Sequence, residues 1–89
     1  MIAYGEYNGW TNRETWMVNL WLTNEQYSHE VLQRIIKTFE TVHEQAQELE
    51  NIVRDDVAYR GGESSMWSDL LGVGLGRVNW YEIVESNRA

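Results

Sequence analysis

Residues 8–21 read NGWTNRETWMVNLW and place three tryptophans within twelve residues, directly after the turn signal Asn8-Gly9. Thr11 and Glu14 fit the S/T-x-x-E capping box, which predicts a helix that begins just after Thr11. Large apolar side chains recur along this helix at Trp16, Met17, Leu20 and Trp21. Stacking platforms for bases need interleaved Lys and Arg, and only Arg13 lies here. The stretch therefore predicts a helix start whose tryptophans enter a core.

A second and longer helical pattern follows, with apolar residues three and four apart over about eight turns. Thr23 and Gln26 fit a second capping box at its start. Because the sequence contains no proline, nothing forces the helix to end before Gly61-Gly62. Residues 24–60 therefore form either one long amphipathic helix or two helices, kinked or folded into a hairpin at Thr38–Thr41.

The last third of the sequence contains two further helix starts and a glycine-rich segment between them. Ser64 or Ser65 caps one helix, and Asn79 caps a short final helix. We interpret the glycines of residues 72–76, GVGLG, as a tight connection or a close helix contact. A phosphate-binding loop needs a preceding strand and another glycine spacing, so a nucleotide site is excluded.

No segment alternates between apolar and polar residues as a strand does, so the predicted fold class is all-α. The length predicts a single small helical domain over residues 1–89, with an irregular segment at residues 1–10. In this architecture, short aromatic-rich helices pack on the long or hairpin helix. The residues that we predict to form the structural core are Trp16, Leu20, Trp21, Trp67 and Trp80.

The charge balance and the residue types that are missing exclude several classes of function. Fourteen acidic and seven basic side chains give a formal net charge of −7. Direct nucleic-acid binding is disfavoured, because neutralising phosphates requires clustered Lys and Arg. The sequence contains no cysteine, so it has no thiolate nucleophile and no Cys-based metal site. It shows neither a membrane-spanning apolar run nor a secretory signal, so we expect a soluble, cytoplasmic protein without membrane contact.

The sequence offers no convincing catalytic or metal site. His29 and His43 lie fourteen residues apart, whereas two histidines that share a zinc ion on one helix lie four apart. They are predicted to be surface residues, unless a hairpin brings them together. No nucleophile elbow and no carboxylate pair in an apolar setting is evident. We therefore expect a protein that is not an enzyme and that holds no cofactor and no metal.

The most informative charges lie in residues 40–56, which contain six acidic side chains and one basic side chain. The acidic residues that we predict to bind a partner are Glu40, Glu44, Glu48, Asp55 and Asp56. The first three follow one another at a spacing of one helical turn, about 5–6 Å. Like charges at this spacing destabilise a helix slightly, so helix stability does not explain them. They form either a row of carboxylates that imitates a nucleic-acid backbone or a solvated face that aids solubility.

Three aromatic residues in the irregular N-terminal segment are further candidates for partner binding. They are Tyr4, Tyr7 and Trp10. Trp and Tyr contribute much of the binding energy at protein interfaces. No helical pattern commits these three side chains to the core, so we expect them to anchor a partner.

Two motifs resemble those of a family of small uncharacterised proteins carried by tailed phages, plasmids and some bacterial chromosomes. The family shares an (S/T)-N-x-(E/A)-T-W-x-V-x-L-W start and a V-N-W-x-E-I end. The matching positions are Thr11, Asn12, Glu14, Thr15, Trp16, Val18, Leu20, Trp21, Val78, Asn79, Trp80, Glu82 and Ile83. The resemblance implies a mobile-element context, in which small acidic proteins often act as anti-restriction or anti-CRISPR proteins.

Together these features predict a non-enzymatic interaction protein in the cytoplasm of a bacterial host cell. Its partner would be a host or defence protein with a basic groove, such as a nuclease, which it would inhibit through an acidic helix that mimics DNA. The alternative is a structural or assembly module that self-associates through its long helix, as a homodimer.

Overall fold

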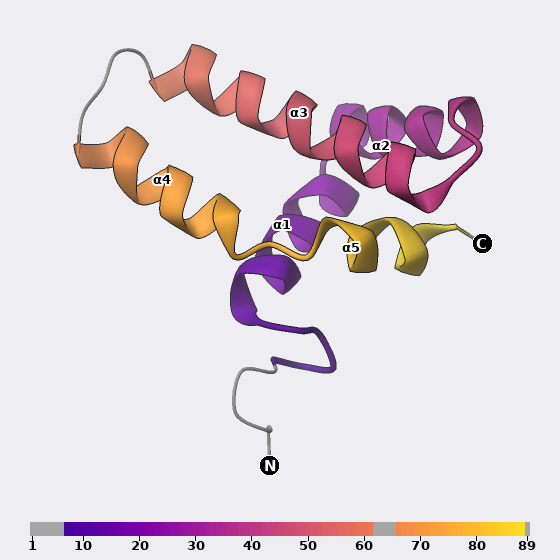
Figure 1. The fold of residues 1–89 in the computed structure, drawn as a ribbon, viewed down its shortest axis with the longest axis horizontal. Coiled ribbons are helices and arrows are strands. Elements are labelled where there is room, and N and C mark those ends of the chain that lie inside the picture. The colour runs from indigo at the N-terminus through magenta and orange to yellow at the C-terminus, as the bar shows by residue number, and fades with distance from the viewer. Residues whose placement is uncertain (1–6, 62–65, 89) are drawn as a thin grey trace.

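The computed structural model describes residues 7–61 and 66–88, in which all regular secondary structure is helical. Five helices follow one another along the chain: α1 (Arg13–Asn24), α2 (Gln26–Thr38), α3 (Val42–Gly61), α4 (Met66–Gly76) and α5 (Trp80–Asn87) (Figure 1). The predicted all-α fold class is confirmed. Among these helices, none is both long enough and apolar enough to cross a membrane.

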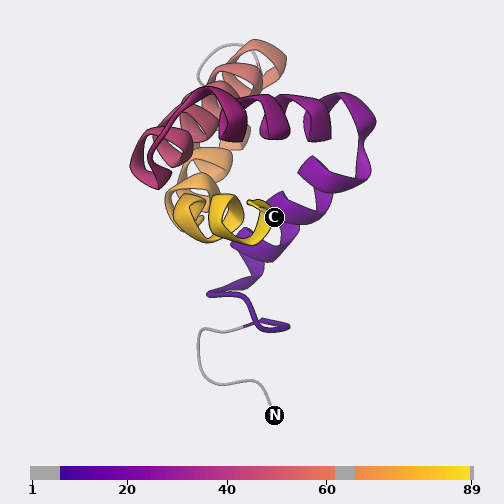
Figure 2. The ribbon, with the colours of Figure 1, turned by 90° about the vertical axis from the view of Figure 1, so that its right-hand side faces the viewer.

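The helices meet around α5, which contacts α1, α2 and α3 although it has only eight residues. Figure 1 shows α3 above α5, and α4 lies beneath the far end of α3. The opposite side of α5 faces α1, and Figure 2 shows α1 and α2 around it. α4 packs mainly against α3. The buried apolar core is formed by Leu32, Ile35, Ala46, Leu49, Leu75, Val78, Trp80, Ile83 and Val84.

Residues 24–60 form two helices, so the hairpin is the predicted arrangement that occurs (Figure 1). The buried side chain of Gln45 donates through Nε2 to the carbonyl oxygens of Ile36, at 3.1 Å, and of Phe39, at 2.6 Å. These bonds satisfy carbonyl groups that the end of a helix leaves without an intrahelical partner. Because Gln45 belongs to the first turns of α3, the same bonds hold the end of α2 against the start of the next helix.

α1 begins one residue later than the predicted capping box places it. Asn12 is the N-cap, and its side-chain oxygen accepts from the Thr15 N–H at 2.9 Å. The box of Thr11 and Glu14 is therefore wrong. The Glu14 carboxylate pairs instead with Arg77 of the α4–α5 connection, at 2.9 Å, so a tertiary contact has taken the side chain from its local role.

α2 also begins differently from the predicted box at Thr23 and Gln26. Glu25 is the N-cap, and its carboxylate accepts from the Tyr27 N–H at 3.0 Å and from the Ser28 hydroxyl at 2.8 Å. The Thr23 hydroxyl donates back to a carbonyl oxygen of α1 and so does not cap α2. A carboxylate at this position also interacts favourably with the positive end of the helix dipole.

The starts of α3 and α5 follow the residue types that cap helices well. The Thr41 hydroxyl accepts from the Glu44 N–H at 3.1 Å and donates to the Glu44 carboxylate at 2.9 Å. Asn79 caps α5, as the sequence predicts, by accepting from the Glu82 N–H at 3.1 Å. The serine cap predicted for α4 lies outside the described residues.

Two of the residues that we predict for the core do not enter it. Trp21 is 69% exposed and Leu20 is 37% exposed, so the prediction is wrong for both. Trp16 is half-buried, and Trp80 lies in the core at 6% exposure. The side chain of Trp67 lies outside what the structure describes.

Leu20 and Trp21 point outward because α1 buries a different side of the helix against the core. Thr15 is fully buried, and Val18 and Leu22 pack against the buried apolar residues. Trp16 and Trp21 are five residues apart, which separates them by about 140° around a helix. No single side of α1 can therefore bury both tryptophans.

The glycines at 72, 74 and 76 lie within α4, so the prediction of a tight connection is wrong. A Cβ atom at any of these three positions would meet no heavy atom within 4 Å, so close helix packing does not require them either. Gly9 differs, because it has φ +86° and follows Asn8 at φ 49° in the predicted turn. Positive φ angles of this kind favour Gly and Asn.

Substitution by alanine should have opposite effects on the free energy of unfolding at Gly72, which lies in a helix, and at Gly9, which lies in a turn. Gly72→Ala should raise the free energy of unfolding by about 0.5–1 kcal/mol, because alanine favours a helix interior and the added methyl group meets open space. Gly9→Ala should lower it by about 1 kcal/mol or more, because the left-handed conformation strains a side chain. Equilibrium urea unfolding measures both, and a destabilised Gly72→Ala variant would contradict the helical placement.

The hydrogen bonds of Gln45 lead to a second prediction about the free energy of unfolding. Gln45→Met keeps the size of the side chain but removes the donor to the two carbonyl groups at the end of α2, and should lower the free energy of unfolding by about 1–3 kcal/mol. Gln47→Met makes the same change at an exposed position of α3 and should alter stability by about 0.5 kcal/mol or less. Equal losses in urea unfolding would show that Gln45 does not hold the α2–α3 turn.

Candidate functional site

A network of hydrogen bonds joins the start of α1 to the α4–α5 connection. The Asn79 N–H donates to the Thr15 hydroxyl at 2.8 Å, and this hydroxyl donates to the Asn12 side-chain oxygen at 2.7 Å. The Asn12 side-chain amide then donates to the Arg77 carbonyl oxygen at 2.7 Å. The fully buried Thr15 hydroxyl is thus both donor and acceptor, between segments more than sixty positions apart.

Further bonds extend this network on both sides. The Thr11 N–H donates to Glu82 Oε1 at 3.0 Å, and Asn79 Nδ2 donates to the Thr11 hydroxyl at 3.2 Å. At the other end of α5, Asn87 Nδ2 donates to Asn19 Oδ1 of α1 at 2.9 Å. We call the connected group at the start of α1 the terminal joint: Thr11, Asn12, Thr15, Arg77, Asn79 and Glu82.

The terminal joint accounts for polar positions in both motifs of the sequence resemblance. Thr11, Asn12 and Thr15 come from the first motif, and Asn79 and Glu82 come from the second. Their side chains bond to one another or to each other's backbone, and so satisfy polar groups that folding brings together. The two motifs therefore specify the hydrogen bonds that hold the start of α1 against the α4–α5 connection.

The predicted aromatic anchors Tyr7 and Trp10 are held by contacts within the chain. Their backbones exchange hydrogen bonds of 2.9 and 2.8 Å across the tight turn. The Tyr7 ring lies 4.9 Å from the Trp16 ring and 5.7 Å from the Arg13 guanidinium carbon, while Trp10 packs against the core. Both rings remain only half-buried. Tyr4, the third predicted anchor, lies outside the described residues.

Three of the predicted acidic residues share the outward side of α3, which we call the acidic face: Glu44, Glu48 and Asp55. Spacings of four and seven residues keep them within about 40° around the helix and spread them over about 17 Å along it. Ala46 and Leu49, which α3 buries, lie on the opposite side. The acidic face is therefore supported from behind by the core.

The other two predicted acidic residues do not belong to this face. Glu40 lies in the connection before α3 begins at Val42, so the predicted helical row of Glu40, Glu44 and Glu48 is wrong at its first member. The chain leaves the helical path there because the α2–α3 turn intervenes. Asp56 follows Asp55 directly, which places it about 100° further around α3.

The basic residue nearest to the acidic face in the sequence, Arg54, forms its ion pair with a residue outside that face. Arg54 pairs with Glu50 at 2.8 Å, one turn earlier on a neighbouring side of α3. Within the part of the chain that the structure describes, Glu48 and Asp55 form no ion pair. Among the described side chains, the acidic face therefore presents Glu44 and Asp55 to the solvent, with half-buried Glu48 between them.

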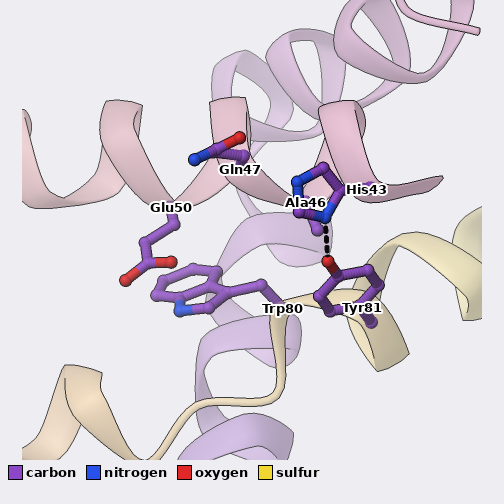
Figure 3. Close-up of a pocket in the computed structure, with 6 residues that line it drawn as sticks. All are labelled: His43, Ala46, Gln47, Glu50, Trp80 and Tyr81. Atoms are coloured by element: carbon purple, nitrogen blue, oxygen red, sulfur yellow. Dashed lines mark hydrogen bonds between the residues drawn. The ribbon is translucent and has the colours of Figure 1, made fainter. Parts of the chain in front are cut away.

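A shallow pocket lies between α3 and the start of α5. It is lined by His43, Ala46, Gln47, Glu50, Trp80 and Tyr81 (Figure 3). His43 Nδ1 and the Tyr81 hydroxyl form a hydrogen bond that ties the two helices together (Figure 3). Glu50 is held by Arg54, so the carboxylate does not orient the imidazole as a catalytic triad requires. This arrangement links α3 to α5.

The hairpin does not bring the two histidines together. His29 lies near the start of α2 and His43 near the start of α3, so about nine residues of helix, or about 14 Å, separate His29 from the turn. Among residues 7–61 and 66–88, no group of three His, Asp or Glu side chains could hold a metal ion.

Sequence reasoning missed an apolar patch on the outer side of α1. Met17, Leu20 and Trp21 lie three and four residues apart and are 40%, 37% and 69% exposed. This spacing is the one that predicts a core-facing stripe, so the sequence signal alone points the wrong way. The buried Thr15 hydroxyl decides which side of α1 faces inward.

The terminal joint predicts that a single hydroxyl matters for stability. Thr15→Val keeps the shape of the side chain but leaves the Asn79 N–H without its acceptor, and should lower the free energy of unfolding by about 1–3 kcal/mol. Thr38→Val, at an exposed position of α2, is the matched control and should cost about 0.5 kcal/mol or less. Equal unfolding midpoints in urea would contradict a structural role of the joint.

Comparison with known proteins adds the family but no activity. No curated protein and no solved structure matches the chain. Residues 3–84 match a family of unknown function, DUF7249, and this stretch includes the whole terminal joint and the acidic face. Because the match spans most of the sequence, the chain belongs to the family DUF7249.

Proposed function

We propose that this chain is a non-enzymatic interaction protein of a phage or plasmid that inhibits a host defence nuclease or another nucleic-acid-binding protein. The observation that carries the proposal is the acidic face, which places exposed Glu44 and Asp55 and half-buried Glu48 along one side of one helix. A basic groove that accepts a nucleic-acid backbone would accept this face in its place.

The electrostatics of the chain support this mode of binding. The acidic face lies on a helix that is packed against α5 and the core, so the backbone that carries its carboxylates is held in position before a partner binds. Preorganised charge reduces the entropy lost on binding. The formal net charge of −7 would also speed the encounter with a basic partner, most strongly at low ionic strength.

The surroundings of the motifs also favour interaction over catalysis. The motif residues of the terminal joint bond to one another and hold the start of α1 against the α4–α5 connection. The sequence resemblance supports the mobile-element context and the bacterial cytoplasm as the place of action. Inhibitors that occupy a groove need a shaped and charged surface, which the acidic face supplies.

A structural or assembly module that self-associates through its long helix is the second candidate. Ile52 and Tyr59 favour it, because they leave apolar surface on α3 at 37% and 89% exposure. The other large apolar residues of α3, such as Leu49 and Val53, pack within the chain. Most of the apolar side of the helix is thus already occupied, and the acidic face is the larger outward feature.

Charge reversal on the acidic face tests the proposed inhibition. Glu48→Lys together with Asp55→Lys should weaken inhibition of DNA cleavage at least tenfold, across a panel of purified restriction and CRISPR nucleases that the unchanged chain inhibits. Glu44 is left intact because its carboxylate also accepts from the Thr41 hydroxyl that caps α3. The changes are at the surface, so the free energy of unfolding should stay within about 1 kcal/mol.

The matched control reverses two acidic residues elsewhere, Glu30→Lys and Glu85→Lys, on α2 and α5. Each double variant adds two charges per substitution, four in all, and takes the formal net charge from −7 to −3. Inhibition should survive in the control. An equal loss in both variants would indicate an effect of net charge alone, and full inhibition by the Glu48 and Asp55 variant would overturn the proposal.

A further inference from the structure

The pocket between α3 and α5 combines aromatic rings with polar side chains. On the α5 side, Trp80 is buried at 6% exposure, and Tyr81 lies next to it at 47% exposure. On the α3 side, Gln47 and Glu50 contribute an amide and a carboxylate (Figure 3). We call this space the α3–α5 pocket. It offers aromatic surface and hydrogen-bond acceptors in one place.

We propose that the α3–α5 pocket binds the guanidinium group of an arginine side chain that belongs to the basic partner. The inference rests on the proposed function for the source of this arginine. The pocket has a volume of about 120 Å³. Pockets that hold drug-sized molecules measure about 300–1,000 Å³. The α3–α5 pocket therefore suits the end of one side chain better than a whole small molecule.

The charges around the pocket favour a cation over an anion. Residues 43–54 contain three acidic side chains and one basic side chain, and α5 contains Glu82 and Glu85 but no Lys or Arg. The basic side chain, Arg54, donates through Nε to Oε2 of Glu50 at 2.8 Å. A carboxylate has about four lone-pair sites, so Glu50 can accept from a second guanidinium as well.

The aromatic part of the lining favours arginine over lysine. A guanidinium is planar, stacks on aromatic rings and donates several N–H bonds, whereas a lysine ammonium is compact and strongly hydrated. Among aromatic side chains, Trp attracts a cation most strongly. The hydrogen bond between His43 and Tyr81 holds the Tyr81 ring in place before an arginine arrives (Figure 3). Such preorganisation reduces the entropy lost on binding.

The pocket lies on the side of α3 next to the acidic face. Gln47 follows Glu44 by three residues, and Glu50 follows it by six, which places them about 60° and 120° around the helix in the same direction. Gln47 is exposed and also lines the pocket. A partner whose groove covers the acidic face can therefore reach the pocket with a long side chain.

Titration of the isotope-labelled full chain with a blocked Gly-Arg-Gly peptide, up to about 50 mM, tests the site by NMR, because millimolar dissociation constants appear as gradual shifts. The indole N–H signal of Trp80 should move. Gly-citrulline-Gly has nearly the same shape without the charge, and it should bind at least fivefold more weakly, as should Gly-Lys-Gly. Trp21 is the internal control, because it is 69% exposed and would report stacking of arginine on any accessible indole.

A matched pair of variants tests the carboxylate. Glu50→Gln keeps the size of the side chain and should raise the dissociation constant of the arginine peptide at least fivefold. Glu30→Gln, on α2 and outside the pocket, should leave it unchanged. Each variant takes the formal net charge from −7 to −6, so net charge cannot explain a difference between them. The comparison of the three peptides uses the unchanged chain and does not depend on the folding of a variant.

Three results would overturn the inference: equal binding of the arginine peptide and either matched peptide, a larger shift at Trp21 than at Trp80, or equal affinities of the Glu50→Gln and Glu30→Gln variants. The peptide assay contains no nuclease, so its outcome is separate from charge reversal at Glu48 and Asp55. Nuclease inhibition without arginine binding would leave the proposed function standing and remove this contact. Arginine binding without nuclease inhibition would uphold the pocket and remove a nuclease as the source of the arginine.

Discussion

The buried hydroxyl of Thr15 is the contact on which the rest of the structure depends. It lies between the N-cap of α1 and the N-cap of α5, accepting from the Asn79 N–H and donating to Asn12. Both caps are therefore built with help from a segment more than sixty positions away. A buried polar group without a partner costs more than a hydrogen bond contributes, so the start of α1 and the start of α5 stabilise one another where they meet.

This requirement explains why an aromatic-rich helix turns tryptophan outward. A helix can bury one side, and α1 buries the side that carries Thr15, Val18 and Leu22. Trp21 lies elsewhere around the helix and remains 69% exposed. Trp80, by contrast, packs in the core at 6% exposure, because it is the first residue of α5 and lies beside the terminal joint. The hydrogen bonds thus decide which aromatic residues stabilise the fold and which remain available at the surface.

The outward surfaces that result differ in their chemistry. The acidic face of α3 is charged and supported by the core, which suits a basic partner and a contact that depends on ionic strength. The exposed patch of α1, formed by Met17, Leu20 and Trp21, is apolar instead.

The sequence by itself determined the helical class, the Asn8-Gly9 turn and the Asn79 cap, whereas it left open whether residues 24–60 form one helix or two. Each of these follows from residues that are close together in the chain. It also determined the surplus of acidic residues on α3, since helical spacing relates Glu44, Glu48 and Asp55 within one element. Only the tertiary structure decided that Asn12 caps α1, that Trp21 is exposed and that Glu40 leaves the acidic row. The physical reason is that helical periodicity relates the residues within a helix, whereas the side that faces inward depends on partners such as Asn79, far away in sequence.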